Sequence, residues 1–332
     1  MRFYANARQR TTATARYFAA GMLPMADVVV EHKEGIGAFD PVFKPVLTFV
    51  SDAYRDAVQK QLEARFRLWQ DGPARQALSE DYALLADVID FEASDGFQSG
   101  KYAPWVCDDI QIALEEGKDI SVVGSLKTAS AAADALMLQY YETDDAQAAA
   151  FGRDLSEDDW KSVVDVNTAY QQLHYDAPLI GVNAAHPMLT EILGELQNTD
   201  RKFTFLCGHD SNVYTVLSAL DASDYELPGT VEKKTPIGVK LLFEKWLADD
   251  GTEYARVRLV YQSTEQLRNR TALTLENPPM SYDIRLPGLE VNGDGYYRLE
   301  DVLGCLRNAI EAYDALVEMY SDDSEAALED AA

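Results

Sequence analysis

The chain has 332 residues, with 29 Lys and Arg against 56 Asp and Glu, a formal net charge of −27 and 47% hydrophobic residues. This charge, with an isoelectric point near 4.4, argues against nucleic-acid binding and against docking on anionic lipid, because both need a basic surface. The hydrophobic content argues against a generally disordered chain, and no apolar run approaches the length of a membrane span. Three cysteines allow at most one disulfide, so they indicate neither a disulfide framework nor a compartment.

The first fifty residues have an α/β pattern, and we expect no signal peptide at their start. We expect a short strand at 2–6, a helix at 11–23 that is N-capped by one of its first two threonines, and a strand and turn within 26–35. Four arginines precede the first acidic residue, Asp27. In so acidic a chain this local positive charge indicates either ordinary solvated arginines or an anion-binding patch.

The segment 51–174 is mainly helical. Apolar periodicity and serine caps predict four helices here, within residues 51–69, 78–91, 126–142 and 155–175. Such a block inserted between two α/β segments is typical of a helical cap domain on an α/β domain.

The α/β pattern returns after residue 174. The predicted elements are a helix at 186–197, a strand, turn and helix over 202–221, strands at 239–248 and 254–263, and a closing helix at 297–320 with a candidate break at Gly304. The last segment, 321–332, holds five acidic residues and no basic one, which predicts a solvated tail. The fold class is therefore α/β, a sheet flanked by helices with an inserted, mainly helical cap: domain one is 1–50 plus 175–320, and the cap is 51–174.

The most informative local motif is Gly208-His209-Asp210-Ser211, placed between a predicted strand and a predicted helix N-capped by Ser211. Catalytic groups of open α/β sheets gather at the carboxyl ends of strands, and a helix N-terminus attracts anions. His209 could donate to a phosphate oxygen, and Asp210 could protonate a leaving alkoxide. The alternative is a histidine and an aspartate that only satisfy a turn.

Arg10 stands just before the first predicted helix. An arginine in this position can pair bidentately with a phosphate beside free helix amides. Arg10 and His209 are 199 positions apart, so their meeting in one pocket is an expectation from the logic of α/β folds and not from spacing.

These segments together resemble the histidine acid phosphatase family, branch 2 of the histidine phosphatase superfamily, and in particular its bacterial glucose-1-phosphatase branch. The similarity covers YANARQRTTATARYFAAGMLP from residue 4 and GHDSNVYTVLSAL from residue 208. It runs from about Tyr4 to about Gly293 and also includes LMLQYYE, TPIGVKLLFEKW, VYQSTEQLRN and ALTLE.

The resemblance implies roles for individual residues. Arg10 corresponds to the family's phosphate-binding arginine, His209 to the histidine that hydrogen-bonds the phosphoryl group, and Asp210 to the general acid. Asp134 and Glu116 lie near acidic cap positions that contact substrate in relatives. The family implies a phosphatase of small phosphate esters, such as sugar phosphates or phytate, that is periplasmic or secreted and needs no metal or other cofactor.

The resemblance also implies a gap. The family's nucleophile is a histidine in an Arg-His-Gly-x-Arg motif, and none of His32, His174 and His186 has that setting. We therefore expect an N-terminally truncated chain that lacks the central nucleophile-bearing strand and is inactive or impaired. The alternatives are a non-catalytic protein that binds phosphate or sugar phosphate, and a structural α/β protein with no pocket. The sequence leaves the preferred ester and the oligomeric state open.

Overall fold

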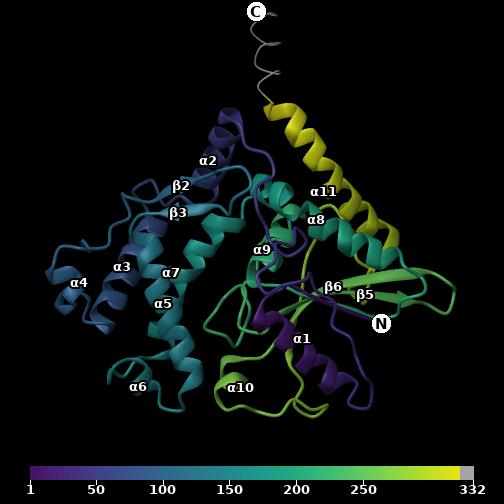
Figure 1. Cartoon of the computed structure of the whole chain (residues 1–332), viewed down its shortest axis with the longest axis horizontal. Coiled ribbons are helices and arrows are strands. Elements are labelled where there is room, and N and C mark those ends of the chain that lie inside the picture. Colours follow the sequence, from purple (N-terminus) through teal and green to yellow (C-terminus); the bar gives the residue numbers. More distant parts are fainter. Residues whose placement is uncertain (322–332) are drawn as a thin grey trace, which may run out of the picture.

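The structure, a computed structural model, describes residues 1–321. The predicted acidic tail therefore lies outside the described residues, except for Ser321. Figure 1 shows a helical group on one side, containing α2 to α7, and a group built on β5, β6, α8 and α11 on the other, with α9 between them. This arrangement confirms the predicted α/β class. No helix within residues 1–321 combines the length and the apolar character that a membrane crossing needs.

The helical group contains the four predicted helices together with a small hairpin, which the sequence did not predict. Its elements are α2 (Asp52–Phe66), α3 (Pro73–Val88), η1 (Phe91–Ala93), α4 (Asp95–Gln98), β2 (Gln111–Ala113), β3 (Ser121–Val123), α5 (Ser125–Glu142), α6 (Ala146–Ala149) and α7 (Glu157–Tyr175). The Ser51 hydroxyl accepts from the Tyr54 amide, and Ser156 forms a capping box with Asp159. Both serine caps are therefore confirmed, and they start α2 and α7 where the sequence predicts.

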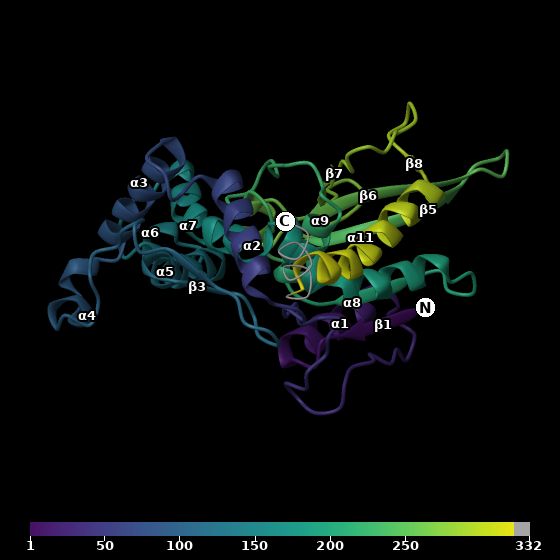
Figure 2. The same cartoon turned by 90° about the horizontal axis from the view of Figure 1, so that it is seen from above.

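The other elements form the α/β part of the molecule. They are β1 (Arg2–Ala5), α1 (Gln9–Met22), α8 (Pro178–Gln197), β4 (Thr204–Cys207), α9 (Asp210–Ala219), β5 (Lys240–Leu247), β6 (Glu253–Tyr261), α10 (Thr264–Arg268), β7 (Met280–Asp283), β8 (Tyr297–Arg298) and α11 (Leu299–Tyr320). β1 and β4 are parallel partners, while β5, β6 and β7 form an antiparallel sheet in which β8 also pairs with β6. Figure 2 shows α8 and α11 beside this antiparallel sheet.

Two hydrophobic clusters make up most of the core. One joins the helices of the segment 51–174 to the start of α8 and includes the fully buried Trp160 and Tyr54. The other lies among α8, α9, α11 and the β5–β6–β7 sheet and includes Tyr261 and Tyr297. All three cysteines are free thiols.

Four predictions about individual helices and strands are wrong. Helix α1 begins at Gln9 with Arg8 as N-cap, and both threonine hydroxyls, of Thr11 and Thr12, donate to backbone carbonyls instead of capping. The segment 26–35 forms no strand beyond an isolated parallel bridge. Helix α8 begins eight residues before the predicted start at 186, and it continues through an internal proline. Helix α11 runs unbroken through Gly304.

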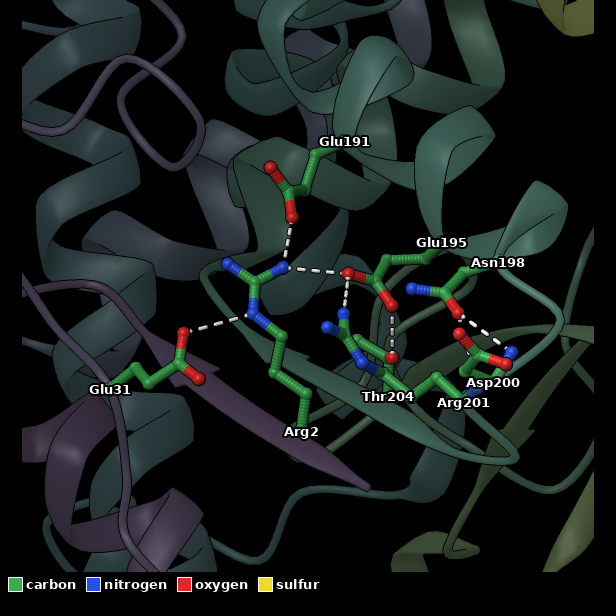
Figure 3. A network of polar contacts seen from close by, with 8 residues as sticks. All are labelled: Arg2, Glu31, Glu191, Glu195, Asn198, Asp200, Arg201 and Thr204. Carbon is green, nitrogen blue, oxygen red and sulfur yellow. Dashed lines mark hydrogen bonds and ion pairs between the residues drawn. The ribbon is translucent and has the colours of Figure 1, made fainter.

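Arg2 anchors the beginning of β1 in a network of acidic side chains (Figure 3). Its guanidinium pairs with Glu31 at 2.9 Å and with Glu195 at 2.8 Å, and it also donates to Glu191. Arg201 donates to the same Glu195 carboxylate. The network therefore connects β1 to α8, and it also connects the loop that contains Glu31 to these two elements.

Candidate active site

The parallel pairing of β1 with β4 brings two distant loops together. Ala5 lies opposite Cys207 in the ladder, and the Asn6 amide donates to the Cys207 carbonyl at 3.0 Å. Both strands end at this edge, and each is followed by a helix. The first turn of α1 therefore lies beside the N-terminus of α9, where the helix dipole and free amides attract negative charge.

His209 stands at the centre of this edge as the N-cap of α9. Arg10 Nη2 lies 3.1 Å from His209 Nδ1, and Asn6 Nδ2 lies 2.7 Å from His209 Nε2. A neutral imidazole accepts at only one ring nitrogen, so these two donors compete for it. The exposed Arg10 guanidinium keeps further donors for an anion.

The surroundings of His209 favour its neutral form. Burial lowers the pKa of His209, and the positive charges of Arg10, Arg8 and Lys44 lower it further, while Asp210 acts in the opposite direction. Three cations close enough to lower the pKa of one imidazole make this edge a local positive patch in a chain whose net charge is −27. Such a patch is suited to hold a phosphate group.

Asp210 is the first residue of α9 and its side chain is exposed. Gln171 Nε2, from α7, donates to Asp210 Oδ2 at 3.2 Å, and the Ser211 amide donates to Oδ1 at 2.9 Å. The predicted N-cap at Ser211 is wrong, since His209 takes that position and its amide donates to Asn212 Oδ1 at 2.9 Å. Asp210 is therefore held by a residue of the helical segment and remains accessible.

The structure places the two acidic cap residues differently. Partial burial raises the pKa of the exposed Asp134 on α5, and the charge of Asp210 raises it further, so the two carboxyl groups are close enough to interact electrostatically. Glu116 is exposed on the turn between β2 and β3. Within residues 1–321 no hydrogen bond or ion pair joins Glu116 to the residues at the site, although Asp119 in the same turn pairs with Lys44.

Three residues at the site carry no role in the sequence prediction. Asn6 is the last residue of a predicted strand, so the rule that catalytic groups gather at strand ends could have identified it. Gln171 lies in the middle of a helix, and Lys44 lies in a loop rich in Pro and Phe; neither has a local signal. Within the described part of the chain, no group of three His, Cys, Asp or Glu side chains is arranged to hold a metal ion.

Comparison with known proteins places this geometry in a family. Residues 94–262 match the model of the histidine phosphatase superfamily, branch 2. The chain is 35% identical to a glucose-1-phosphatase of Providencia rettgeri over 314 residues, which cover 93% of this chain and 73% of that protein. It is 26% identical to phytase AppA of Escherichia coli, over 86% of this chain and 69% of that protein.

The fold comparison agrees with the sequence comparison. The structure of the apo form of Hafnia alvei phytase superposes with a TM-score of 0.82 and 26% identity, covering 94% of this chain and 79% of the phytase. A glucose-1-phosphatase of Salmonella typhimurium shares 34% identity over 90% of this chain and 71% of its own length. The chain therefore belongs to branch 2 of the histidine phosphatase superfamily, as its resemblance predicts, and phosphatase chemistry is the activity of its relatives.

Proposed function

We propose that this protein hydrolyses a sugar phosphate monoester, such as glucose 1-phosphate, with the phosphoryl group held by Arg10 and His209. The observation that carries the proposal is the 3.1 Å approach of Arg10 to His209 across 199 positions of sequence, beside the exposed Asp210. Phosphoryl transfer needs little covalent help from the protein beyond positioning and charge neutralisation. Arg10, Lys44 and the N-terminus of α9 supply that charge, and Asp210 protonates the leaving oxygen.

The leaving-group side of the site supports a sugar over a polyphosphorylated ring. Gln171 donates to Asp210 there, and Asp134 lies within electrostatic range of Asp210. A carboxyl group and an amide suit hydroxyl groups, which donate and accept hydrogen bonds. The additional phosphates of phytate would meet negative charge on that side instead of arginine or lysine. We include Glu116 among the proposed substrate contacts only for larger esters, because it lies on the neighbouring hairpin turn.

Acidic pH favours this function. Because burial and the Arg10 charge lower the pKa of His209, its imidazole gains a proton only in acid, where the imidazolium then adds a positive charge toward the phosphate. We therefore expect turnover and phosphate binding to weaken as the pH rises. A pH profile that stays flat up to about pH 8 would contradict this, since every imidazole with a lowered pKa is neutral there.

We propose further that the attacking histidine is not among the four histidines of this chain, so that the 332 residues alone are impaired in turnover. His174 is buried against the Ile120 carbonyl, and His186 stacks on Tyr313 with ring centroids 4.1 Å apart. His32 is exposed and bonds to the neighbouring Lys33 carbonyl. These placements equally favour the second candidate, a protein that binds sugar phosphate without cleaving it.

One set of measurements separates the two functions. Titration calorimetry with glucose 1-phosphate and with phytate tests binding, and hydrolysis of p-nitrophenyl phosphate with and without added imidazole tests turnover. Imidazole can act as a substitute nucleophile where a histidine is lacking, so rescue that depends on Asp210 supports the enzyme. Binding without rescue supports the non-catalytic protein, and an in-frame stop codon just before Met1 would favour it too. Absence of binding to either ester refutes both.

We also propose the domain division 1–50 with 175–320 against 51–174, and a periplasmic or secreted location. The two separate hydrophobic clusters support the division, since each segment packs mainly on its own core. Limited proteolysis should cut first near residues 50 and 175, and cell fractionation tests the location.

A further inference from the structure

Two residues of helix α5 connect it to the α/β part of the molecule. Tyr141 donates to Glu232 in the loop before β5, and Asp134, seven residues earlier, is close enough to Asp210 for the Asp210 charge to raise the pKa of Asp134. Seven residues are about two helical turns, so the two side chains point the same way and lie about 10 Å apart along the helix axis. Asp134 belongs to the proposed substrate site, whereas Tyr141 is remote from it.

The contact at Tyr141 is buried and polar. The Tyr141 hydroxyl donates to Glu232 Oε2 and lies 3.3 Å from the Thr264 hydroxyl, which itself accepts from the Val231 amide at 3.0 Å. Glu232 is only 5% exposed, and its Oε1 has no hydrogen-bond partner in the described chain. A buried carboxyl group depends strongly on each donor it has, because its unpaired form is costly.

Arg268 of α10 holds the same end of α5. Its guanidinium lies 3.8 Å from the centroid of the Tyr140 ring. It also donates to the Tyr140 carbonyl and, at 3.3 Å, to the Asp144 carbonyl. The last carbonyls of a helix lack intrahelical partners and carry the negative end of the dipole, so a cation placed there fixes the helix end.

We propose that Tyr141, Glu232 and Arg268 form a latch that positions α5, and that through α5 the latch holds Asp134 against the leaving group at Asp210. This inference rests on the proposed function of the site and adds three positioning residues to it. None of the three is among the groups that contact His209 or Asp210. A helix moves as a nearly rigid rod, so releasing its C-terminal end displaces a side chain two turns away.

The test compares two ligands that share one phosphate group. Calorimetry with inorganic phosphate reports on Arg10 and His209, whereas glucose 1-phosphate also reports on Asp134. Tyr141→Phe should weaken glucose 1-phosphate binding about threefold to tenfold while phosphate affinity changes less than about twofold, which is the range for losing one hydrogen bond. Glu232→Gln keeps a side-chain acceptor for the Tyr141 hydroxyl, so it should retain most of the preference for glucose 1-phosphate over inorganic phosphate. Glu232→Ala should lose that preference.

A matched control and a double-mutant cycle separate positioning from general stability. Tyr54→Phe also removes one hydroxyl from the same hydrophobic cluster, a donor to the Leu179 carbonyl, and should leave the ratio of the two affinities unchanged. In an Asp134→Ala background, Tyr141→Phe should have no further effect on that ratio, because the two sites then act through one contact. Melting curves check that each variant is folded.

The outcomes are distinct. If Tyr141→Phe binds both ligands and leaves the ratio of their affinities unchanged, the latch is overturned and the proposed function stays intact. Full additivity of Tyr141→Phe and Asp134→Ala also overturns it, since the latch would then not act through Asp134. Wild-type protein that binds neither ligand overturns the proposed function and this inference with it.

Discussion

Replacing Arg10 by glutamine tests the site most directly. The guanidinium is exposed, lies 3.1 Å from His209 Nδ1, and is the nearest cation to the imidazole for which the structure gives a contact. Hydrogen bonds to charged groups contribute about 1.5–3 kcal/mol, and exposure to solvent and salt places this one near the lower end. The variant should therefore lose about 10- to 30-fold in affinity for inorganic phosphate near neutral pH.

The loss should depend on pH in a defined direction. The Arg10 charge is one of the causes, after burial, that lower the pKa of His209, so Arg10→Gln raises that pKa toward the ordinary value of 6.5. At about pH 5.5 the variant then carries more imidazolium than the wild type, and this charge compensates in part for the missing guanidinium. The affinity ratio of wild type to variant should therefore be larger at about pH 7.5 than at about pH 5.5.

The assay is calorimetry with phosphate at both pH values, with the imidazole titration of His209 followed by NMR. The protonation state of free phosphate is the same for both proteins, because wild type and variant are compared at the same pH. Arg8→Gln is the matched control: Arg8 is a neighbouring exposed arginine that has no hydrogen bond to His209 among the described contacts, so it should cost much less affinity. Equal losses for both variants, or no loss for Arg10→Gln, would refute the reasoning.

Three further predictions concern stability. Arg2→Met should lower the free energy of unfolding at neutral pH by about 2–3 kcal/mol, because it removes the ion-pair partner of the part-buried Glu191 and one of the two arginines that pair with Glu195. Burial raises the pKa of Glu195, but hydrogen bonds, including the one from Arg2, outweigh this and lower that pKa below 4.5. Urea titrations should therefore show that the loss of stability caused by Arg2→Met becomes smaller as the pH falls below about 4.5. Burial lowers the pKa of His174 below 6.5, so His174 is protonated more readily in the unfolded chain than in the folded one as the pH falls. Wild type therefore loses stability between about pH 7 and pH 5, and His174→Gln should lose less in the same urea assay. Gly181→Ala on α8 should lower the melting temperature, since the new Cβ would lie 2.5 Å from the Ala219 backbone nitrogen of α9. Gly194 lies on the same helix, and a Cβ there would have no atom within 4 Å, so Gly194→Ala should stabilise the protein by about 0.5–1 kcal/mol.

Local sequence determined most of the elements of this protein. The serine caps and apolar periodicity of α2 and α7 depend on neighbours three or four residues away, so the sequence alone predicts them. The same holds for the strand, turn and helix around His209 and for the alternating strands β5 and β6. Most of the wrong predictions concern the ends of elements, although the strand expected within 26–35 does not form and α11 is unbroken at Gly304. Thr11 and Thr12, for example, are good capping residues, but their hydroxyls donate to backbone carbonyls.

The site was only partly predictable, and its composition shows why. Arg10, His209 and Asp210 follow from the rule that functional groups gather where strands end and helices begin. Gln171 lies in a helix that looks ordinary in sequence, and it contacts Asp210 only because α7 packs on α9. Only the tertiary structure decided that β1 pairs with β4 and that Arg10 therefore meets His209. A contact across 199 positions leaves no trace in local periodicity, since it depends on the packing of the whole chain.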